Sequence, residues 1–194
     1  MPTDLAPALR LHHFLPRSRA NGPGWRAVVW VQGCTLGCPG CFNPATHSFA
    51  ATKTVPPAAL AARIHGLAGE VQGVTISGGE PLQQLPAVTA LLAALRRGTR
   101  LSTILFTGYT WEEAQARPGI DALLAHLDVL IAGRYEATRR VAAGLLGSTN
   151  KTLHFLTPRY TKADLDAVPE AEVIIGRDGN LIFSGIGPME VNLD

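Results

Sequence analysis

Three cysteines lie close together near the start of the chain, at Cys34, Cys38 and Cys41. They are the only cysteines among 194 residues, and so small and odd a number does not make a disulfide framework. Thiolates at C-x3-C-x2-C spacing are ligands for a soft metal. Gly37 and Gly40 between them allow the backbone to curl around a single centre. The spacing therefore predicts a metal or iron-sulfur centre held by one loop.

Two kinds of centre fit this loop. A structural zinc ion needs a fourth protein ligand to close a tetrahedral site, and His47, six residues after Cys41, is a candidate. An iron-sulfur cubane needs a ligand for each of its four irons, so three cysteines leave one iron open to a substrate or cofactor. The zinc ion would belong to a zinc-stabilised binding module without catalysis, and the cubane to a reactive enzyme.

A second motif follows a predicted buried strand at 74–76. Gly78 and Gly79 provide backbone that a ligand can approach closely, and Glu80 adds a carboxylate that can receive an ammonium group. Pro81 then ends the turn rigidly. The motif indicates a binding site for a molecule that carries an amine, which a zinc-stabilised module leaves unexplained.

The scaffold predicted for these motifs alternates strands and helices. Strands are predicted at 26–32, 74–76, 103–106 and 129–131, and helices at about 56–67, 86–97 and 111–126, the last interrupted at Pro118-Gly119. This alternation predicts a parallel sheet with helical crossovers. Ligands bind outside the carboxyl ends of such strands, and both motifs and Thr107-Gly108 follow strand ends. We therefore expect one site at this edge of the sheet.

The C-terminal part has a looser pattern. A strand is predicted over 152–156 and a short helix around 163–168, and two apolar runs at 172–175 and 181–183 flank an Asp-Gly hairpin signal. At 194 residues the chain is too short for the eight βα units of a complete barrel, which needs about 250 residues. We expect a single α/β domain over 1–194, with a core at about 25–150 and a C-terminal extension at about 151–194. The predicted fold is a partial (β/α) barrel of mainly parallel strands with a C-terminal β-hairpin.

Composition excludes several classes of protein. Hydrophobic residues make up 46% and charged residues 16%, as in a packed globular chain. Seventeen basic and fifteen acidic residues give a net charge of +2, without a basic stripe for phosphates. No stretch approaches the roughly 20 apolar residues of a membrane helix, and the N-terminal segment lacks the apolar run of a signal peptide. We expect a cytoplasmic protein that binds neither nucleic acid nor membranes.

The two motifs together resemble the radical S-adenosylmethionine (radical SAM) superfamily. The matching stretches are Cys34-Thr35-Leu36-Gly37-Cys38-Pro39-Gly40-Cys41-Phe42-Asn43 and Thr75-Ile76-Ser77-Gly78-Gly79-Glu80-Pro81. More narrowly, the chain resembles the activating proteins of glycyl-radical enzymes, nearest to those of anaerobic ribonucleotide reductases. The narrower resemblance rests on Thr107-Gly108-Tyr109-Thr110, Asp128-Val129-Leu130-Ile131, Gly133-Arg134-Tyr135 and Gly147-Ser148-Thr149-Asn150.

The resemblance implies a set of site residues. The three cysteines would ligate a 4Fe-4S cluster whose open iron is chelated by the amino and carboxylate groups of S-adenosylmethionine. The adenine would lie near Phe42 and the backbone around Gly40. The contacts to the rest of S-adenosylmethionine, including its methionine ammonium, are expected from Gly78, Gly79, Glu80 and Thr107.

The resemblance also implies a reaction. The reduced cluster donates one electron to the sulfonium, which gives methionine and a 5'-deoxyadenosyl radical. That radical would abstract a Cα hydrogen from one glycine of a partner glycyl-radical enzyme, with a flavodoxin- or ferredoxin-type protein as the electron donor. The cofactors carry the difficult chemistry, and the protein positions them and excludes water.

Two features depart from the activase pattern. Ala132 stands where the Asp-Val-Leu-Ile-Asp-Gly stretch of the activases has a second acid, with Arg134 as the one nearby substitute. The chain also continues about forty residues past Asn150 and begins with some twenty residues before the first predicted strand. These departures favour, as an alternative, a stand-alone radical SAM enzyme that modifies a small molecule or another protein. No cysteine remains for an auxiliary cluster.

Overall fold

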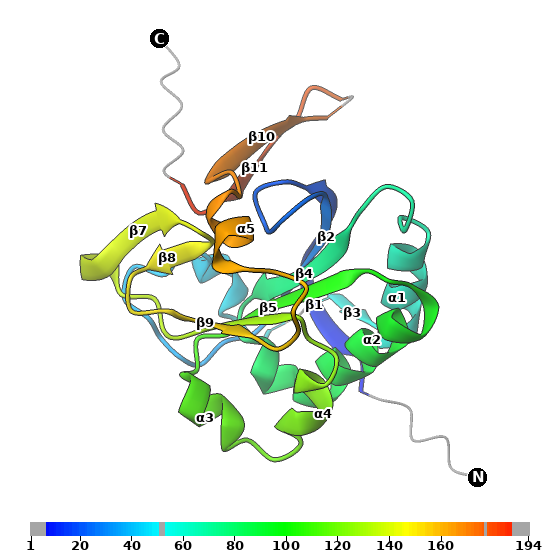
Figure 1. Ribbon diagram of the computed structural model, residues 1–194, viewed down its shortest axis with the longest axis horizontal. Helices are drawn as coiled ribbons and strands as arrows, with labels where there is room; N and C mark the ends of the chain where they lie inside the picture. The colour runs from blue at the N-terminus through cyan, green and yellow to red at the C-terminus, as the bar shows by residue number, and fades with distance from the viewer. Residues whose placement is uncertain (1–6, 51–52, 177, 188–194) are drawn as a thin grey trace.

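The protein is built around a seven-stranded sheet of order β3-β1-β2-β4-β5-β6-β9 (Figure 1). The structure, a computed structural model, describes residues 7–50, 53–176 and 178–187. The strands of this sheet are β1 (Leu9–Ser18), β2 (Arg26–Val31), β3 (Lys53–Val55), β4 (Gly73–Gly78), β5 (Ser102–Phe106), β6 (Val129–Ala132) and β9 (Thr152–Phe155). Strands β2, β4, β5 and β6 run parallel, whereas β1 and β9 are antiparallel to β2 and β6. The prediction of an α/β fold with parallel central strands is confirmed.

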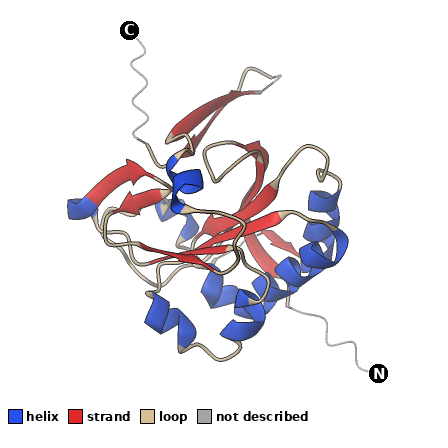
Figure 2. Cartoon of the chain, viewed as in Figure 1, coloured by secondary structure: helices blue, strands red, loops and turns tan. Residues whose placement is uncertain are grey.

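Helices cover the sheet as crossovers between the parallel strands (Figure 2). They are α1 (Pro57–His65), α2 (Leu85–Gly98), α3 (Trp111–Gln115) and α4 (Ile120–Leu124), with α5 (Lys162–Asp166) later in the chain and short 3-10 turns at Pro44–Thr46, Pro81–Gln84 and Ala137–Arg139. In α2 the buried residues Val88, Leu91, Leu92 and Leu95 recur at helical spacing, so one stripe of this helix packs against the sheet. The predicted helix over 111–126 is two helices, separated around the Pro118-Gly119 interruption.

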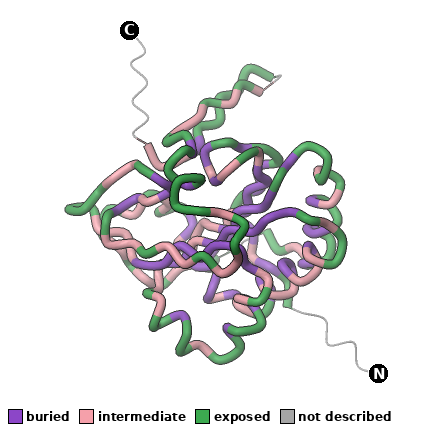
Figure 3. Tube along the Cα trace, viewed as in Figure 1, coloured by how far each residue is buried: buried purple, intermediate pink, exposed green. Residues whose placement is uncertain are grey.

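Alternation along the strands builds a core on each face of the sheet. Leu105 and Leu130 belong to the larger apolar cluster, together with residues of α1, α2 and α4. Ile104 and Ile131, their neighbours along β5 and β6, belong to a second cluster with Leu165 of α5. Successive side chains of a strand point to opposite faces, so these strands are buried on both sides. The buried trace through the middle of the molecule in Figure 3 follows them.

A buried arginine joins the amino ends of three parallel strands. Arg26 is fully buried and donates to Thr75 Oγ1 and Val74 O, both at 2.7 Å, to Ser102 Oγ at 2.9 Å and to the Tyr160 hydroxyl at 3.3 Å. Burial lowers the pKa of this guanidinium to about 10. In the described part of the chain it has no ion-pair partner, so neutral acceptors satisfy it. This network fixes the edge of the sheet that carries the strand amino ends.

Several strands were absent from the prediction. The structure adds β1 and β3 to the sheet edge, and it adds a small two-stranded sheet of β7 (Arg140–Ala143) and β8 (Leu146–Ser148). The expectation that the first twenty residues precede the first strand is wrong, because β1 begins at Leu9 and pairs with both β2 and β3. Near the C-terminus, β10 (Ala171–Ile175) pairs antiparallel with β11 (Leu181–Gly185). No helix in the described ranges is both long and apolar enough to cross a bilayer.

Candidate active site

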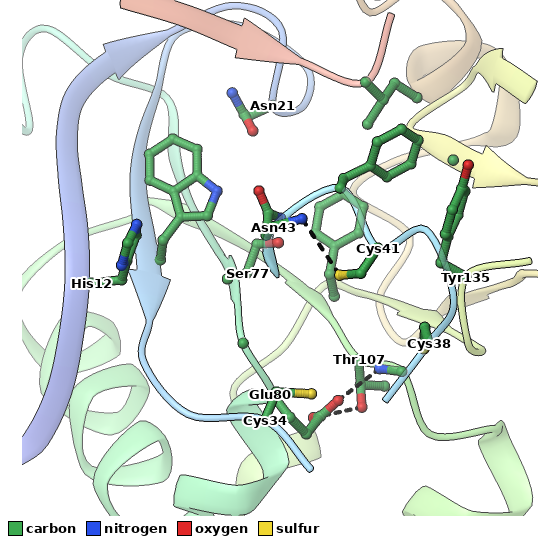
Figure 4. A pocket seen from close by; sticks show the side chains of 18 of the residues that line it. His12, Asn21, Cys34, Cys38, Cys41, Asn43, Ser77, Glu80, Thr107 and Tyr135 are labelled. Carbon is green, nitrogen blue, oxygen red and sulfur yellow. Dashed lines mark hydrogen bonds between the residues drawn. The ribbon is translucent and has the colours of Figure 1, made fainter. Parts of the chain in front are cut away.

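A cavity of about 430 Å³ lies at the carboxyl ends of β2, β4 and β5 (Figure 4). Its wall includes all three cysteines, the turn Gly78–Glu80 and Thr107-Gly108, as expected from the strand ends. Residues distant in the sequence complete it, from β1 at one side to Ile182–Gly187 at the other. The volume falls within the range of small-molecule and cofactor sites.

The cysteine loop curls along one wall of this cavity. All three thiols are free and half-buried, and the φ values of 63° at Gly37 and 69° at Gly40 are those of the left-handed turn expected there. The Cys34 amide donates to His47 O at 3.1 Å, which ties the start of the loop to the segment that follows it. Burial raises the pKa of the Cys34 thiol, and the negative charge of Glu80 adds to the effect.

The three thiols suit a cluster better than a single ion. Within the described ranges, no three Cys, His, Asp or Glu side chains converge closely enough to hold one metal ion. A closed zinc site requires four ligand atoms at about 2.0–2.3 Å from one point, and His47 lines the cavity without forming such a group. In a cubane each thiolate binds its own iron, so the sulfurs surround one cluster but need not meet at a single ion. The soft donor set, the curled loop and the adjoining cavity therefore fit a 4Fe-4S cluster.

The two motifs are joined backbone to backbone. Gly79 N donates to Val31 O at 2.8 Å, and Glu80 N donates to Gly33 O at 2.9 Å. A Cβ atom at Gly79 would lie 2.4 Å from Gly33 O, so only glycine permits this approach. We expected Gly78 and Gly79 to allow the close approach of a ligand. In the structure Gly79 allows the close approach of the cysteine-loop backbone at Gly33.

Glu80 is fully buried and bridges the ends of β4 and β5 (Figure 4). Its Oε1 accepts from Leu82 N and Thr107 Oγ1, both at 2.8 Å, and its Oε2 accepts from Gly108 N at 2.7 Å. Burial raises the pKa of this carboxyl, and the three hydrogen bonds oppose the rise. Because a carboxylate offers about four acceptor positions, one position on Oε2 remains for a donor from the cavity.

Comparisons with known proteins place this site in a family. A family model described as a 4Fe-4S single cluster domain matches residues 20–154. The anaerobic ribonucleoside-triphosphate reductase-activating protein of Salmonella typhi is 31% identical over 160 residues, which cover 76% of this chain and 99% of that protein. The chain belongs to this family of activating proteins. The activating protein of Enterobacteria phage T4 is also 31% identical, over 157 residues that cover 77% of this chain and 96% of that protein.

The activating-protein family has the chemistry that the motifs indicated. The chain is a radical SAM enzyme whose cofactors are a 4Fe-4S cluster and S-adenosylmethionine. Among solved structures, QueE from Escherichia coli aligns with a TM-score of 0.43 and 20% identity, over 53% of this chain and 54% of that chain.

Phe42 lies where the cysteine loop meets the small sheet of β7 and β8. Its ring is 38% exposed and lines the cavity, with its centroid 4.4 Å from that of Tyr135. The guanidinium of Arg140 lies 4.7 Å from the ring centroid, and a Cβ atom at Gly147 would be 2.6 Å from the ring. Gly147, from the family-matching stretch at 147–150, therefore packs closely against the aromatic ring of Phe42. Gly40, which was expected near the adenine, is not among the residues that line the cavity; a Cβ atom there would lie 3.4 Å from Ala137 and 3.9 Å from Tyr135.

The residue that replaces the second acid of the activase pattern, Ala132, lies in the core. Ala132 is fully buried and belongs to the apolar cluster on the helical side of the sheet. Arg134 pairs with Glu113 at 2.6 Å on the surface and does not line the cavity, so it does not replace the acid. Asp128, which matched the family pattern, lies at the amino end of β6, where it pairs with Arg96 at 3.0 Å. Its contribution is structural.

Sequence reasoning missed a cation in the cavity wall. Lys151 lines the cavity with Cys38, Cys41 and Glu80, and its ammonium donates to Gly133 O. Burial lowers the pKa of this lysine, while the neighbouring thiolates and carboxylate oppose the change. No sequence pattern marks this residue, because its neighbours in the cavity are distant along the chain.

Proposed function

We propose that this enzyme installs a glycyl radical on a partner protein, an anaerobic ribonucleoside-triphosphate reductase. The observation that carries the proposal is the single cavity shared by the cysteine loop and the Gly78–Glu80 turn in a member of the activating-protein family. The partner is taken from the names of the curated relatives. The electron donor is proposed to be a flavodoxin- or ferredoxin-type protein.

The proposal gives each wall of the cavity a task. Cys34, Cys38 and Cys41 hold the cluster, and the remaining acceptor position of Glu80 receives the methionine ammonium of S-adenosylmethionine. Thr107 acts as a positioning residue, because its hydroxyl proton is already donated to Glu80. The backbone of Gly78 and Gly79 holds the turn against the cysteine loop.

The adenine is assigned to the aromatic end of the cavity. Phe42 and Tyr135 form this wall, with Gly40 beside Tyr135, and an aromatic face suits a purine ring. When bound, the cluster supplies the electron that cleaves a carbon-sulfur bond of S-adenosylmethionine and so generates the radical that takes hydrogen.

The fold suits a polypeptide substrate under the same proposal. The central parallel strands carry three loops to one cavity, and we propose that they act as a partial barrel within one domain over 1–194. The sheet ends in the edge strands β3 and β9, so the strands do not close around the site. A target glycine on a loop of another protein needs such lateral access.

Electron paramagnetic resonance tests this function. The protein is reconstituted anaerobically with iron and sulfide, reduced, and mixed with S-adenosylmethionine and the anaerobic reductase of the same organism. We expect 5'-deoxyadenosine and a glycyl-radical doublet on the reductase, and neither product with Cys38→Ala. Cleavage of S-adenosylmethionine without a glycyl radical would support the stand-alone enzyme instead. Stoichiometric zinc without iron uptake would support the zinc-stabilised module.

A further inference from the structure

The β10–β11 hairpin exposes an apolar face. Val173 pairs with Phe183 and Ile175 pairs with Leu181 across the two strands, and their alternate positions place all four side chains on one face. Their exposed fractions are 53% for Val173, 38% for Phe183, 75% for Ile175 and 50% for Leu181. We call these four side chains the hairpin face.

The opposite face of the hairpin is attached to the body of the protein. Glu172 and Ser184 form the next cross-strand pair. The Glu172 carboxylate accepts from the Ser18 hydroxyl and, at 2.9 Å, from Arg19 N. Asn21 Nδ2 donates to Ser184 Oγ at 2.6 Å. The same face also carries the pair Ile174 and Ile182, and Ile182 lines the cavity. Since this face makes the attachment, the hairpin face is turned away from it.

The hairpin face is continuous with the active-site cavity. Phe183 belongs to both, and the chain that follows it, Ser184–Gly187, forms part of the cavity wall. At Gly185 the φ value is 121°, and a Cβ atom there would lie 2.3 Å from Glu170 O. Ile186 N and Gly187 N both donate to that same carbonyl at 2.8 Å. This bend holds the carboxyl end of β11 against the cavity wall, while the turn end of the β10–β11 hairpin extends away from the sheet (Figure 1).

The hairpin face is uncovered although its side chains are large and apolar. Of the eight large apolar side chains that are exposed in the described ranges, four form the hairpin face and a fifth, Ile182, lies on the opposite face of the same hairpin. The two strands pair only with each other in the part of the chain that the structure describes, and a two-stranded ribbon alone is marginally stable in water. Contiguous exposed apolar side chains on a soluble protein mark interaction surfaces.

We propose that the hairpin face docks the polypeptide partner whose glycine is activated. The proposal rests on the proposed function, because a target loop that enters the cavity past Phe183 must pass along this face. The family model matches residues 20–154, so the hairpin lies outside the matched part of the chain, beside the shared site, and recognises an apolar surface next to the target loop. Four side chains are far fewer than the 20–30 residues per partner of a stable interface. The face therefore extends a contact centred on the cavity and does not by itself hold two copies of this chain together.

The test removes the apolar face and leaves the cavity intact. The variant carries Val173→Thr, Ile175→Thr and Leu181→Thr, which retain β-branched or strand-compatible side chains, and it keeps Phe183. Reductive cleavage of S-adenosylmethionine without the partner is expected to stay at the wild-type rate. The dissociation constant for the anaerobic reductase, measured by anaerobic biolayer interferometry, is expected to rise at least about tenfold.

Two further variants keep the test decisive. Phe155→Thr is the matched control, because Phe155 is 39% exposed on β9 and does not line the cavity; its affinity for the reductase should be unchanged. Ile175→Lys changes only the most exposed of the four side chains, so it folds even if the triple variant does not, and it should weaken binding as well.

The outcomes separate the two proposals. If the wild type forms no glycyl radical on the reductase, the proposed function fails. If the wild type forms the radical and the hairpin variants bind the reductase as tightly as Phe155→Thr, the docking inference is overturned while the function stands. If light scattering shows that the wild type alone is a dimer and the hairpin variants are monomers, the face joins two copies and the docking inference is likewise overturned.

Discussion

Replacing Glu80 with glutamine separates the charge of this side chain from its shape. Glutamine keeps one carbonyl oxygen for the Leu82 amide and the Thr107 hydroxyl, each 2.8 Å from Oε1. Its NH₂ group replaces Oε2 and cannot accept from Gly108 N, now at 2.7 Å. One buried donor loses its acceptor, which costs about 1–3 kcal/mol.

The removal of a buried charge offsets part of this cost. Burial raises the pKa of Glu80, so its ionised form is disfavoured in the folded protein relative to the unfolded chain. We expect Glu80→Gln to lower the free energy of unfolding by about 1–2 kcal/mol, which corresponds to a midpoint lower by about 2–8 °C. Because the folded pKa is raised, the wild type should lose stability relative to the variant as the pH rises from 4.5 through the folded value.

We expect Glu80→Gln to weaken S-adenosylmethionine binding by more free energy than it removes from the stability of the fold. A charge-assisted hydrogen bond contributes about 1.5–3 kcal/mol, so its loss weakens binding roughly 10- to 150-fold. Isothermal titration calorimetry on the reconstituted, unreduced protein measures this without turnover, and circular dichroism measures the thermal midpoint.

Thr107→Val is the matched control for this experiment. It removes one donor to Oε1 and keeps the carboxylate, so it should cost about 1 kcal/mol of stability and change the affinity for S-adenosylmethionine much less. If Glu80→Gln binds S-adenosylmethionine within about threefold of the wild type, the carboxylate does not receive the ammonium. Equal losses in both variants would mean that Glu80 acts only by shaping the turn.

Three other perturbations test the rest of the structure. His47→Ala should retain the iron content of the reconstituted wild type, whereas Cys38→Ala should lose it; loss in both, measured by metal analysis, would contradict the cluster assignment. Burial raises the pKa of Asp128, but its hydrogen bonds outweigh this effect and hold the pKa below 3.8. The ionised carboxylate therefore stabilises the folded protein fully above pH 3.8, and this stabilisation is lost as the pH falls through the folded pKa. Asp128→Asn should therefore lower the free energy of unfolding at neutral pH by about 1–3 kcal/mol. In acid the free energies of unfolding of variant and wild type, both measured by urea unfolding, should become more similar. Gly185→Ala should expose the hairpin to limited proteolysis, because its Cβ would collide with Glu170 O; an unchanged cleavage rate would disprove that constraint.

The cysteine loop and the Gly78–Glu80 turn were predictable because their chemistry is local. Three thiols within eight residues and a Gly-Gly-Glu sequence after an apolar strand require no knowledge of distant contacts. The parallel strands were predictable for the same reason, since strands such as Val129–Ala132 are apolar throughout and buried on both faces.

The first strand escaped prediction for a physical reason. The pairing of β1 with β2 shifts register between Leu11 and His13 and again between Leu15 and Ser18. Each irregularity breaks the two-residue alternation from which a strand is recognised. The edge strand therefore looked like an irregular leader, although it brings His12 and His13 to the cavity wall.

The roles of Asp128 and Lys151 depended on tertiary structure. Asp128 belongs to a stretch that matches the family pattern, and the strand direction places it at the edge of the sheet away from the cavity, beside Arg96 and Thr103. Lys151 follows a polar turn and gains its place in the cavity only through the antiparallel pairing of β9 with β6. Neither contact can be inferred from neighbours in the sequence.

The hydrogen bonds that join Gly79 to Val31 and Glu80 to Gly33 couple two binding events. Whatever orders the cysteine loop also orders the turn that meets the ammonium group, and the reverse must hold to the same extent, because coupling free energies between two sites are reciprocal. S-adenosylmethionine should therefore raise the affinity of the protein for the cluster by the same factor by which the assembled cluster raises the affinity for S-adenosylmethionine. In an enzyme whose metal centre has an open coordination position, the bound co-substrate thus also stabilises that centre.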